Sequence, residues 1–382
     1  MRILILGADG YLGWPLSMYC SQQGHEVIAV DNYLRRSMCR DLNCEPLAPN
    51  PNLMQRTRLW QEISGKQIQT YIGDVTDYHF LKGIFEKHQP DGVVHLAEQP
   101  SAPYSMIDRD RAAGTVVNNL ISTLNVVYAV RETNPDCQIV KIGTMGEYGT
   151  PDIDIEEGWL DIEHKGRKDR FLFPRQASSL YHTTKIQDTD LLWFYVRIWG
   201  LRVTDLMQGP VYGIATEQTA LNEGLLPNFN YDEIFGTVLN RFVVQAIVDY
   251  PLTVYGKGSQ IRGYLNLLDS LQCIYLSLVK PAAAGELRIF NQIVETFSVN
   301  DLALKVSEVG KSLGYQVNIN FMPNPRVEKE EHYYNPACTG LLDLGLQPHY
   351  LTTEILVNMF KLVEKYQGNI NREAIFRGVG WK

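Results

Sequence analysis

Short apolar segments alternate with longer segments of helical periodicity along most of the chain. Apolar runs of this length are typical of strands buried on both faces, as in a parallel sheet. The pattern predicts such strands at residues 3–6, 27–30, 68–72, 92–96, 138–142, 202–207 and 288–291. It predicts helices at residues 12–22, 78–87, 190–199, 237–248 and 299–313. This alternation predicts an α/β fold of the Rossmann type, with a doubly wound parallel sheet.

Three glycines follow the first predicted strand directly. Gly7, Gly10 and Gly13 have the spacing G-x-x-G-x-x-G, and the second strand ends at Asp31. A strand, a glycine-rich turn, a helix and a second strand ending in an acid form a dinucleotide-binding unit. Gly7 permits the tight turn, Gly10 lets the backbone approach a pyrophosphate at the helix N-terminus, and Gly13 lets the helix pack on the strand. Asp31 is expected to bind a ribose diol, which favours NAD over NADP because the acid repels a 2′-phosphate.

Further candidates for cofactor contacts lie at or just after strand ends, because ligands bind at this edge of an open parallel sheet. Asp77 is the better N-cap for the helix after the third strand, which leaves Asp74 to bind the adenine. Arg35 and Arg36 lie in the long segment 31–65 and either contact the cofactor phosphates or only face solvent. The expected cofactor contacts are Gly7, Gly10, Tyr11, Leu12, Gly13, Asp31, Asn32, Arg35, Arg36, Asp74, Val75, Leu96, Ala97, Asn118, Asn119, Tyr181, Lys185 and Val211.

The composition excludes several classes of function. A net charge of −8 argues against binding to nucleic acids or to anionic membranes. The six cysteines have neither disulfide nor zinc spacing, so we expect reduced thiols and no metal site. Because the first strand begins at residue 2 and no apolar run approaches ~20 residues, we expect neither a signal peptide nor membrane insertion. We expect a cytoplasmic protein, or an organellar one if a transit peptide has been removed.

The length of the chain predicts two lobes, because single cores stop growing near ~250–300 residues and this chain has 382. We expect residues 1–208 to form the NAD-binding domain, to which parts of 237–275 return. Residues 209–382 are expected to form a smaller C-terminal α/β lobe that binds the substrate. Residues 151–175 are polar and are expected to form a loop on the substrate side, and 252–265 is predicted as a strand, a turn and a second strand.

Tyr181 and Lys185 are four residues apart at the start of a predicted helix and therefore share one of its faces. A phenol with a pKa of ~10 is a poor base at neutral pH, but a lysine ammonium and an oxidised nicotinamide stabilise its phenolate. Such a phenolate removes the proton of an alcohol during oxidation. Thr144, at the end of the fifth strand, either binds the same substrate oxygen or caps a turn. Asn118 and Asn119 either anchor the cofactor or a loop, or are satisfied core amides.

The glycine spacing resembles that of the extended short-chain dehydrogenases/reductases, and several longer segments are more specific. These are Gly-Thr-Met-Gly-Glu-Tyr-Gly-Thr-Pro-Asp-Ile-Asp-Ile-Glu-Glu-Gly, which ends at residue 158, and the segments at 98–109, 176–182, 252–258 and 323–335. They are similar to segments of the UDP-sulfoquinovose synthases, and the similarity covers nearly the whole chain. The resemblance implies a reaction of UDP-glucose with sulfite, catalysed with a tightly held NAD. It also implies, by analogy, a homodimer or a higher homo-oligomer.

The reaction of that family implies roles for four residues. Tyr181, helped by Thr144 and Lys185, is expected to remove the 4-hydroxyl proton while hydride passes to NAD⁺. The 4-ketone acidifies the C5 hydrogen, and the 6-hydroxyl then leaves as water. Sulfite adds to C6, and hydride returns to C4, so the cofactor is regenerated. His182 is the first candidate for the proton transfers of the elimination, although it could also only pack within its helix.

Two positions depart from the patterns of related enzymes. Sugar 4,6-dehydratases carry Asp-Glu directly after the threonine, where this chain has Met145 and Gly146. Without carboxylates at these positions the site repels an anionic nucleophile less. Glu147 is the second candidate for proton transfer. Plant relatives carry an arginine where this chain has Pro100. If that cation binds sulfite in the relatives, either another residue binds it here or the sulfur donor differs.

A nucleotide-sugar diphosphate is best bound by a guanidinium fork. Arg262 is the first candidate, Arg326 the second and Arg241 the third, with surface salt bridges as the alternative for each. The expected substrate contacts are Thr144, Gln208, Asn240, Arg241, Arg262 and Arg326. Two other functions remain open at this stage. A UDP-sugar 4-epimerase or 4,6-dehydratase would share the Thr144, Tyr181 and Lys185 triad, and a non-catalytic protein would only bind NAD.

Overall fold

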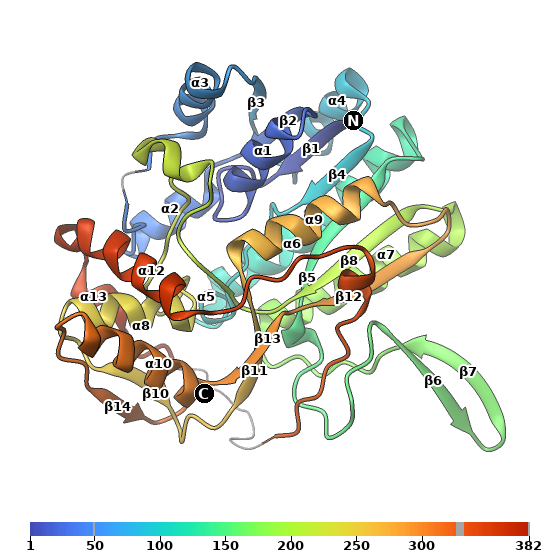
Figure 1. The fold of residues 1–382 in the computed structure, drawn as a ribbon. Helices are drawn as coiled ribbons and strands as arrows, with labels where there is room; N and C mark the ends of the chain where they lie inside the picture. Colours follow the sequence, from blue (N-terminus) through green and yellow to red (C-terminus); the bar gives the residue numbers. More distant parts are fainter. Residues whose placement is uncertain (49, 326–331, 381–382) are drawn as a thin grey trace.

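Seven parallel strands form the central sheet (Figure 1). The computed structural model describes residues 1–48, 50–325 and 332–380. In spatial order the strands are β12 (Leu287–Gln292), β8 (Arg202–Gln208), β5 (Gln138–Thr144), β4 (Gly92–His95), β1 (Arg2–Leu6), β2 (Glu26–Asp31) and β3 (Ile68–Ile72). The chain moves outward from β1 through β2 to β3 and then returns to β4 on the other side. The switch point, where ligands bind in such sheets, therefore lies between β1 and β4.

Helices cover both faces of this sheet. In β1, Ile3 and Ile5 pack toward α1 (Gly13–Gln22), α3 (Leu53–Ser64) and α9 (Leu267–Val279). Leu4 and Leu6 pack on the opposite face toward α4 (Tyr78–His88), α6 (Arg109–Thr133) and α7 (Leu180–Trp199). All four side chains are fully buried, which explains why this strand is a continuous apolar run. The predicted α/β class and the doubly wound parallel sheet are confirmed.

A second core forms from the C-terminal part of the chain. The helices α8 (Val238–Ile247), α10 (Val299–Ser312) and α12 (Thr353–Lys365) pack around buried Phe242, Val306 and Phe360. Beside them, β10 (Leu252–Tyr255) pairs with β14 (Ile319–Met322). A three-stranded sheet of β13 (Glu295–Ser298), β11 (Ile261–Asn266) and β9 (Val211–Tyr212) lies next to the central sheet. From this part of the chain, α9 and β12 join the first core.

The predicted strand, turn and strand at 252–265 form as β10 and β11, which pair with other strands and not with each other. Two other segments differ from expectation. The predicted loop at 151–175 contains a hairpin, β6 (Trp159–His164) and β7 (Arg167–Leu172), that projects from the body of the protein (Figure 1). Lys165 and Gly166 both have positive φ at its turn, as two-residue hairpin turns require. The segment 31–65 contains the helix α2 (Leu34–Asp41) as well as α3.

The remaining elements are short and connect the longer ones. They are α5 (Ala102–Ser105), α11 (Gly340–Asp343), α13 (Arg372–Ile375) and the 3₁₀ turns η1 (Met145–Glu147), η2 (Thr219–Leu221), η3 (Glu223–Leu225) and η4 (Gln367–Asn369). Within the described ranges, α6 alone has the length and hydropathy of a membrane-crossing helix. Half of its most apolar window is buried inside the protein, as in an ordinary core helix. All six cysteines are free thiols.

Candidate active site

A cavity of about 510 Å³ opens at the carboxyl ends of β1, β4 and β5 and extends to the second core. Most of the expected cofactor contacts line it: Gly7, Gly10, Tyr11, Leu12, Gly13, Asp31, Asn32, Arg35, Val75, Leu96, Ala97, Asn118, Tyr181, Lys185 and Val211. Its far wall includes residues of α8, β10 and β11. One continuous cavity therefore reaches both the glycine-rich turn and the second lobe, which suits an elongated ligand such as a dinucleotide beside a nucleotide sugar.

The glycine-rich turn is packed so closely that it accepts no side chains at two of its glycines. Gly7 has a φ of +83°, and a Cβ there would lie 2.6 Å from the carbonyl carbon of Leu96. A Cβ on Gly13 would lie 2.2 Å from the carbonyl oxygen of Gly7. The start of α1 thus sits against the end of β1 with bare backbone, as pyrophosphate binding at a helix N-terminus requires. This cradle fits the NAD that the sequence predicts.

Asp31 ends β2 at the edge of the cavity. Its Oδ2 accepts a hydrogen bond of 2.9 Å from the backbone N–H of Asp9, and its Oδ1 accepts one from Tyr33. Burial, followed by the charge of Asp9, raises the pKa of Asp31 to about 6. The acid therefore lies where a ribose diol would meet it, and it is already held by the glycine-rich turn.

Three expected cofactor contacts do not line the cavity. Arg36 donates to both carboxylate oxygens of Asp9 and ties α2 to the glycine-rich turn. Asp74 accepts hydrogen bonds from Thr76 at 2.8 Å and from the side chain of Asn32 at 3.1 Å. Both residues thus support loops that carry cavity-lining residues.

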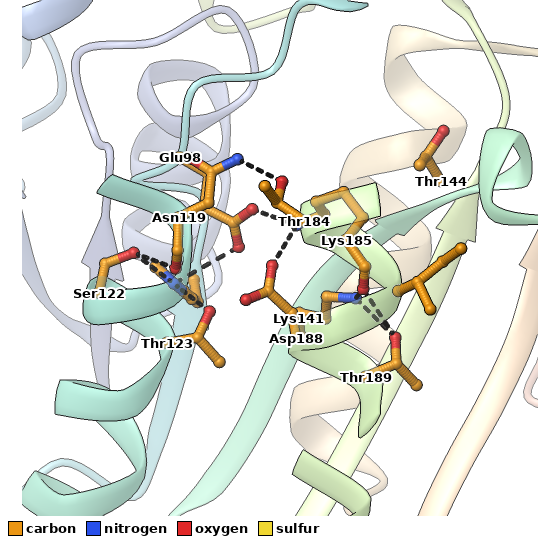
Figure 2. Close-up of polar contacts among 12 residues, drawn as sticks. Glu98, Asn119, Ser122, Thr123, Lys141, Thr144, Thr184, Lys185, Asp188 and Thr189 are labelled. Atoms are coloured by element: carbon orange, nitrogen blue, oxygen red, sulfur yellow. Dashed lines mark hydrogen bonds and ion pairs between the residues drawn. The ribbon is translucent and has the colours of Figure 1, made fainter. Parts of the chain in front are cut away.

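Asn119 is the third of these, and it anchors the loop after β4. Its Oδ1 accepts from the backbone N–H of Gln99 at 2.8 Å, and its Nδ2 donates to the Thr184 hydroxyl at 3.0 Å (Figure 2). This is the loop-anchoring alternative of the sequence analysis. The neighbouring amide, Asn118, does line the cavity.

The four residues with expected catalytic roles all line the cavity. Thr144 is the last residue of β5, and its hydroxyl accepts from the backbone N–H of Gly146 at 3.2 Å. Ser179 caps α7 by accepting from the backbone N–H of His182, so the helix begins just before Tyr181. Lys185 follows one turn later on the same face. Burial, followed by the charge of Glu98, raises the pKa of Tyr181 above its ordinary value.

Some of the expected substrate contacts already hydrogen-bond to other protein groups, and one does so only in part. Gln208 and Asn240 line the cavity and hydrogen-bond to protein groups, Ser270 at 2.8 Å and the Gly213 backbone at 3.2 Å respectively. Arg262 also lines the cavity, and its Nη1 contacts His332 Nε2 at 2.9 Å.

Arg241 has part of its guanidinium buried without a hydrogen-bond partner. Its side chain lines the cavity and is 7% exposed as a residue, and its Nε is buried without a hydrogen-bond partner. A buried guanidinium in this state calls for an anionic ligand. Arg241, the third candidate by sequence, therefore becomes the first candidate for the diphosphate. Arg326 lies outside the described residues.

Comparison with known proteins agrees with this geometry. The model of the NAD dependent epimerase/dehydratase family matches residues 3–291. The chain is 48% identical over 381 residues to the chloroplastic UDP-sulfoquinovose synthase of Spinacia oleracea, covering 100% of this chain and 79% of that protein. It is 46% identical to the UDP-sulfoquinovose synthase of Sulfolobus acidocaldarius, covering 97% and 95%. The chain belongs to the UDP-sulfoquinovose synthase family. It is therefore an enzyme, and its cofactor is NAD.

Solved structures place the fold of this family member among nucleotide-sugar enzymes. The UDP-glucose 4-epimerase of Thermotoga maritima, solved with UDP-glucose, superposes with a TM-score of 0.69 at 21% identity, covering 96% of this chain and 98% of that one. The UDP-glucuronic acid 4-epimerase of Bacillus cereus, solved with UDP-glucuronic acid and NAD, gives 0.71 at 18% identity, covering 96% and 99%. At these identities the similarity concerns the fold alone.

His182 occupies the space beside Gly146, one of the two positions where dehydratases carry a carboxylate. A Cβ on Gly146 would lie 2.3 Å from His182 Nε2. The Ser178 hydroxyl lies 2.9 Å from Nδ1 and holds the ring in this orientation. A side chain at 146 and this position of the ring exclude each other. Glu147, the other candidate for proton transfer, is fully buried beside Lys141 and does not line the cavity.

Glu98 is a cavity-lining residue to which the sequence analysis gave no role. It follows β4, its side chain is 5% exposed, and its Oε2 forms an ion pair with Lys185 Nζ (Figure 2). Burial opposes its ionisation, but Lys185 holds the pKa of Glu98 below its ordinary value. The sequence does contain a sign of this role, because an acid that follows a buried apolar strand needs a partner for its charge.

Proposed function

We propose that this chain converts UDP-glucose and sulfite to UDP-sulfoquinovose, with Thr144, Tyr181 and Lys185 acting at C4 of the sugar. The observation that carries the proposal is the convergence of these three side chains on one cavity with the glycine-rich turn. The names of its relatives from spinach and Sulfolobus support the choice of substrate class.

At C4, Tyr181 is the group that takes the hydroxyl proton. Lys185, one helical turn away, supplies positive charge that favours the phenolate, and Thr144 holds the same sugar oxygen by a hydrogen bond. When bound, NAD supplies the acceptance and return of hydride at C4. Because Tyr181 keeps the proton as a phenol, it can give the same proton back when the 4-hydroxyl forms again.

At C5 and C6, His182 is the group we assign to proton transfer. Its Nε2 faces position 146, where no side chain competes, and its Nδ1 is held by Ser178. An imidazole can both accept and donate a proton near neutral pH. Met145 and Gly146 add no negative charge next to it, so an approaching sulfite anion meets less repulsion than it would beside carboxylates.

The proposal is tested by incubating the purified protein with UDP-glucose and ³⁵S-labelled sulfite. We expect label in a UDP-hexose whose mass equals that of the sulfonated sugar. An epimerised or dehydrated sugar without label would favour the epimerase or dehydratase alternative and contradict sulfite as the nucleophile. Recovery of unchanged UDP-glucose from protein that carries NAD would contradict catalysis on this substrate.

Arg241 is proposed to bind the diphosphate of the nucleotide sugar. Replacement of Arg241 by methionine should raise the KM for UDP-glucose about 10- to 100-fold, since a lost hydrogen bond to a charged group has this effect. The NAD content should stay the same. Arg262→Met is the matched variant, and we expect a smaller rise because Arg262 already contacts His332. A larger rise in Arg262→Met would reverse the assignment.

We also propose that the protein is a homodimer, paired through α6 and α7. Both helices expose large apolar side chains on the side away from the sheet: Val117, Ile121, Tyr128, Phe194 and Ile198. Light scattering should give twice the mass of one 43.5 kDa chain, and Phe194→Glu should reduce it to one. Phe321→Glu, an equally exposed phenylalanine on β14, is the control. A single-chain mass for the unchanged protein would contradict pairing.

We propose that the two lobes, defined by the two hydrophobic cores, bind different ligands. Residues 1–208 together with α9 and β12 hold NAD, and the remaining C-terminal residues hold the nucleotide sugar. The cavity lining supports this division, because the glycine-rich turn lies in the first part and Arg241 in the second. The KM and NAD-content measurements on Arg241→Met test it as well, since a loss of NAD from that variant would contradict it.

A further inference from the structure

Charged side chains from α7, β5, β8 and the segment after β4 are buried together. Figure 2 shows Glu98, Lys141, Lys185 and Asp188 of this group. Within the described residues this cluster has four acids, Glu98, Glu147, Asp188 and Asp205, and three bases, Lys141, Arg175 and Lys185. Each of these side chains is at most 5% exposed. With every group ionised the cluster would carry one uncompensated negative charge, which is costly in a site that excludes water.

Three of the four acids have close polar partners. Glu98 pairs with Lys185 Nζ. Asp205 Oδ2 accepts from the Thr189 hydroxyl at 2.7 Å and lies 3.2 Å from Lys141 Nζ. Glu147 Oε1 accepts from the backbone N–H of Thr144 at 3.2 Å and lies 3.4 Å from Lys141 Nζ. Burial raises the pKa of Glu147, and Lys141 opposes this rise. Each of the three acids thus has at least one close hydrogen bond or ion pair within the cluster.

Asp188 is the exception. It is fully buried one turn after Lys185 on α7, and neither carboxyl oxygen has a hydrogen-bond partner. The nearest cation, Lys185 Nζ, is 3.8 Å away and already paired with Glu98. One proton on Asp188 makes the cluster neutral, and it does so at the acid that gains least from ionisation.

We propose that Asp188 is buried as a protonated acid and that ionised Glu98 positions Lys185 and sets the pH at which Tyr181 loses its proton. The proposal rests on the proposed role of Tyr181 at C4 and adds a positioning residue to it. Glu98 touches Lys185 directly and reaches Tyr181 through its charge. Asp188 contributes no charge, so Glu98 is the one anion paired with Lys185.

The electrostatics agree with this assignment. Burial, followed by the charge of Glu98, raises the pKa of Asp188 well above its ordinary value, and the Thr123 hydroxyl opposes this without hydrogen-bond geometry. Burial lowers the pKa of His95 to about 4, so this ring beside Glu98 is neutral. The other titratable groups around Tyr181 and Lys185 are Lys141, Glu147, Arg175, His182 and Asp205. All of these stay unchanged in the variants below.

Infrared spectroscopy of the protein as purified with its NAD tests where the proton is. Above neutral pH, we expect a carbonyl band of a protonated carboxyl group that shifts in D₂O and is lost in Asp188→Asn. The band should remain at the same frequency in the charge-conserving Glu98→Asp. A band that shifts in Glu98→Asp or persists in Asp188→Asn, or no such band in the unchanged protein, overturns the assignment of the proton. Because no substrate is involved, this result does not depend on the proposed reaction.

The pH profile of sugar oxidation tests the role of Glu98. We measure the first reduction of bound NAD on mixing with UDP-glucose, without sulfite. The rate is plotted against pH. Glu98 is the charged group that acts most strongly on Tyr181, and Asp188 acts less strongly. In Glu98→Gln, Tyr181 should therefore ionise at lower pH even when Asp188 ionises, and the rising limb of the pH–rate profile should move toward acid by up to about one pH unit. The limb should stay in place in Asp188→Asn, in the charge-conserving Glu98→Asp and in Asp110→Asn, an exposed acid on α6.

Each other outcome contradicts part of the proposal. A shift in Asp188→Asn would show that Asp188 is ionised, and an unmoved limb in Glu98→Gln would show that Glu98 does not govern Tyr181. If Asp188→Asn does not fold, an unshifted band in Glu98→Asp and the pH limb of Glu98→Gln still decide the case. A limb that persists in Tyr181→Phe would contradict the proposed function and leave the infrared result standing.

Discussion

Tyr181→Phe is expected to lower the rate of UDP-sulfoquinovose formation by about 10²- to 10⁴-fold, the range of general acid–base catalysis. Only the hydroxyl is lost, and Tyr181 lines the cavity together with Thr144 and Lys185. The ring and the start of α7 remain, because Ser179 still caps the helix through His182. Labelled-sulfite incorporation at saturating UDP-glucose measures the loss, and the NAD content measured after denaturation should not change.

Tyr148→Phe is the matched control for this prediction. Tyr148 lies a few residues after Thr144 and packs edge-on against Phe173, and its buried hydroxyl has no hydrogen-bond partner. Its removal should leave the rate within about twofold, since no interaction is broken. A Tyr181→Phe protein that is as active as Tyr148→Phe would assign the proton transfer at C4 to another group.

Gly7→Ala is expected to release the cofactor, with at least a roughly tenfold drop in NAD per chain after purification. A Cβ at this position meets the carbonyl carbon of Leu96 at 2.6 Å and the backbone nitrogen of Ala97 at 2.8 Å. Because both are backbone atoms of the neighbouring strand end, the turn itself must move, and it is the turn that approaches the pyrophosphate. Absorbance of the released NAD measures the loss of cofactor, and the thermal unfolding temperature measures the loss of stability that the displaced turn causes.

Gly24→Ala is the control that separates the strain of a left-handed backbone from the steric clash of the added Cβ. Gly24 has a φ of +85°, close to that of Gly7, but a Cβ there meets nothing within 4 Å. This variant should lose about 1–2 kcal/mol of stability through the left-handed backbone alone and should keep its NAD. If both variants lost NAD equally, the close approach of β1 and β4 would not be the reason for glycine at position 7.

Features that depend on neighbouring residues could be predicted from the sequence. The dinucleotide unit lies within the first 31 residues, and Tyr181 and Lys185 are one helical turn apart. Both follow from local spacing and hydrophobic period. The central sheet is confirmed, and Tyr181 and Lys185 line the same cavity, while their catalytic role stays a prediction.

Features that depend on distant partners could not be predicted in this way. Glu98 is 87 residues from Lys185, and nothing near it in the sequence indicates the pair. The ranking of Arg262 above Arg241 changed because His332 lies against Arg262 in space. Arg36 binds the carboxylate of Asp9, and no pattern near either residue in the sequence indicates this pair.

The contact between Gly146 and His182 has a consequence for how such enzymes diverge. A carboxylate side chain can enter position 146 only if the imidazole leaves its present position, which displaces the proposed proton carrier. Substitutions at 146 and 182 should therefore not be additive in their effects on activity. A change at either position alters the surroundings of the other, so we expect the two to change together among related enzymes.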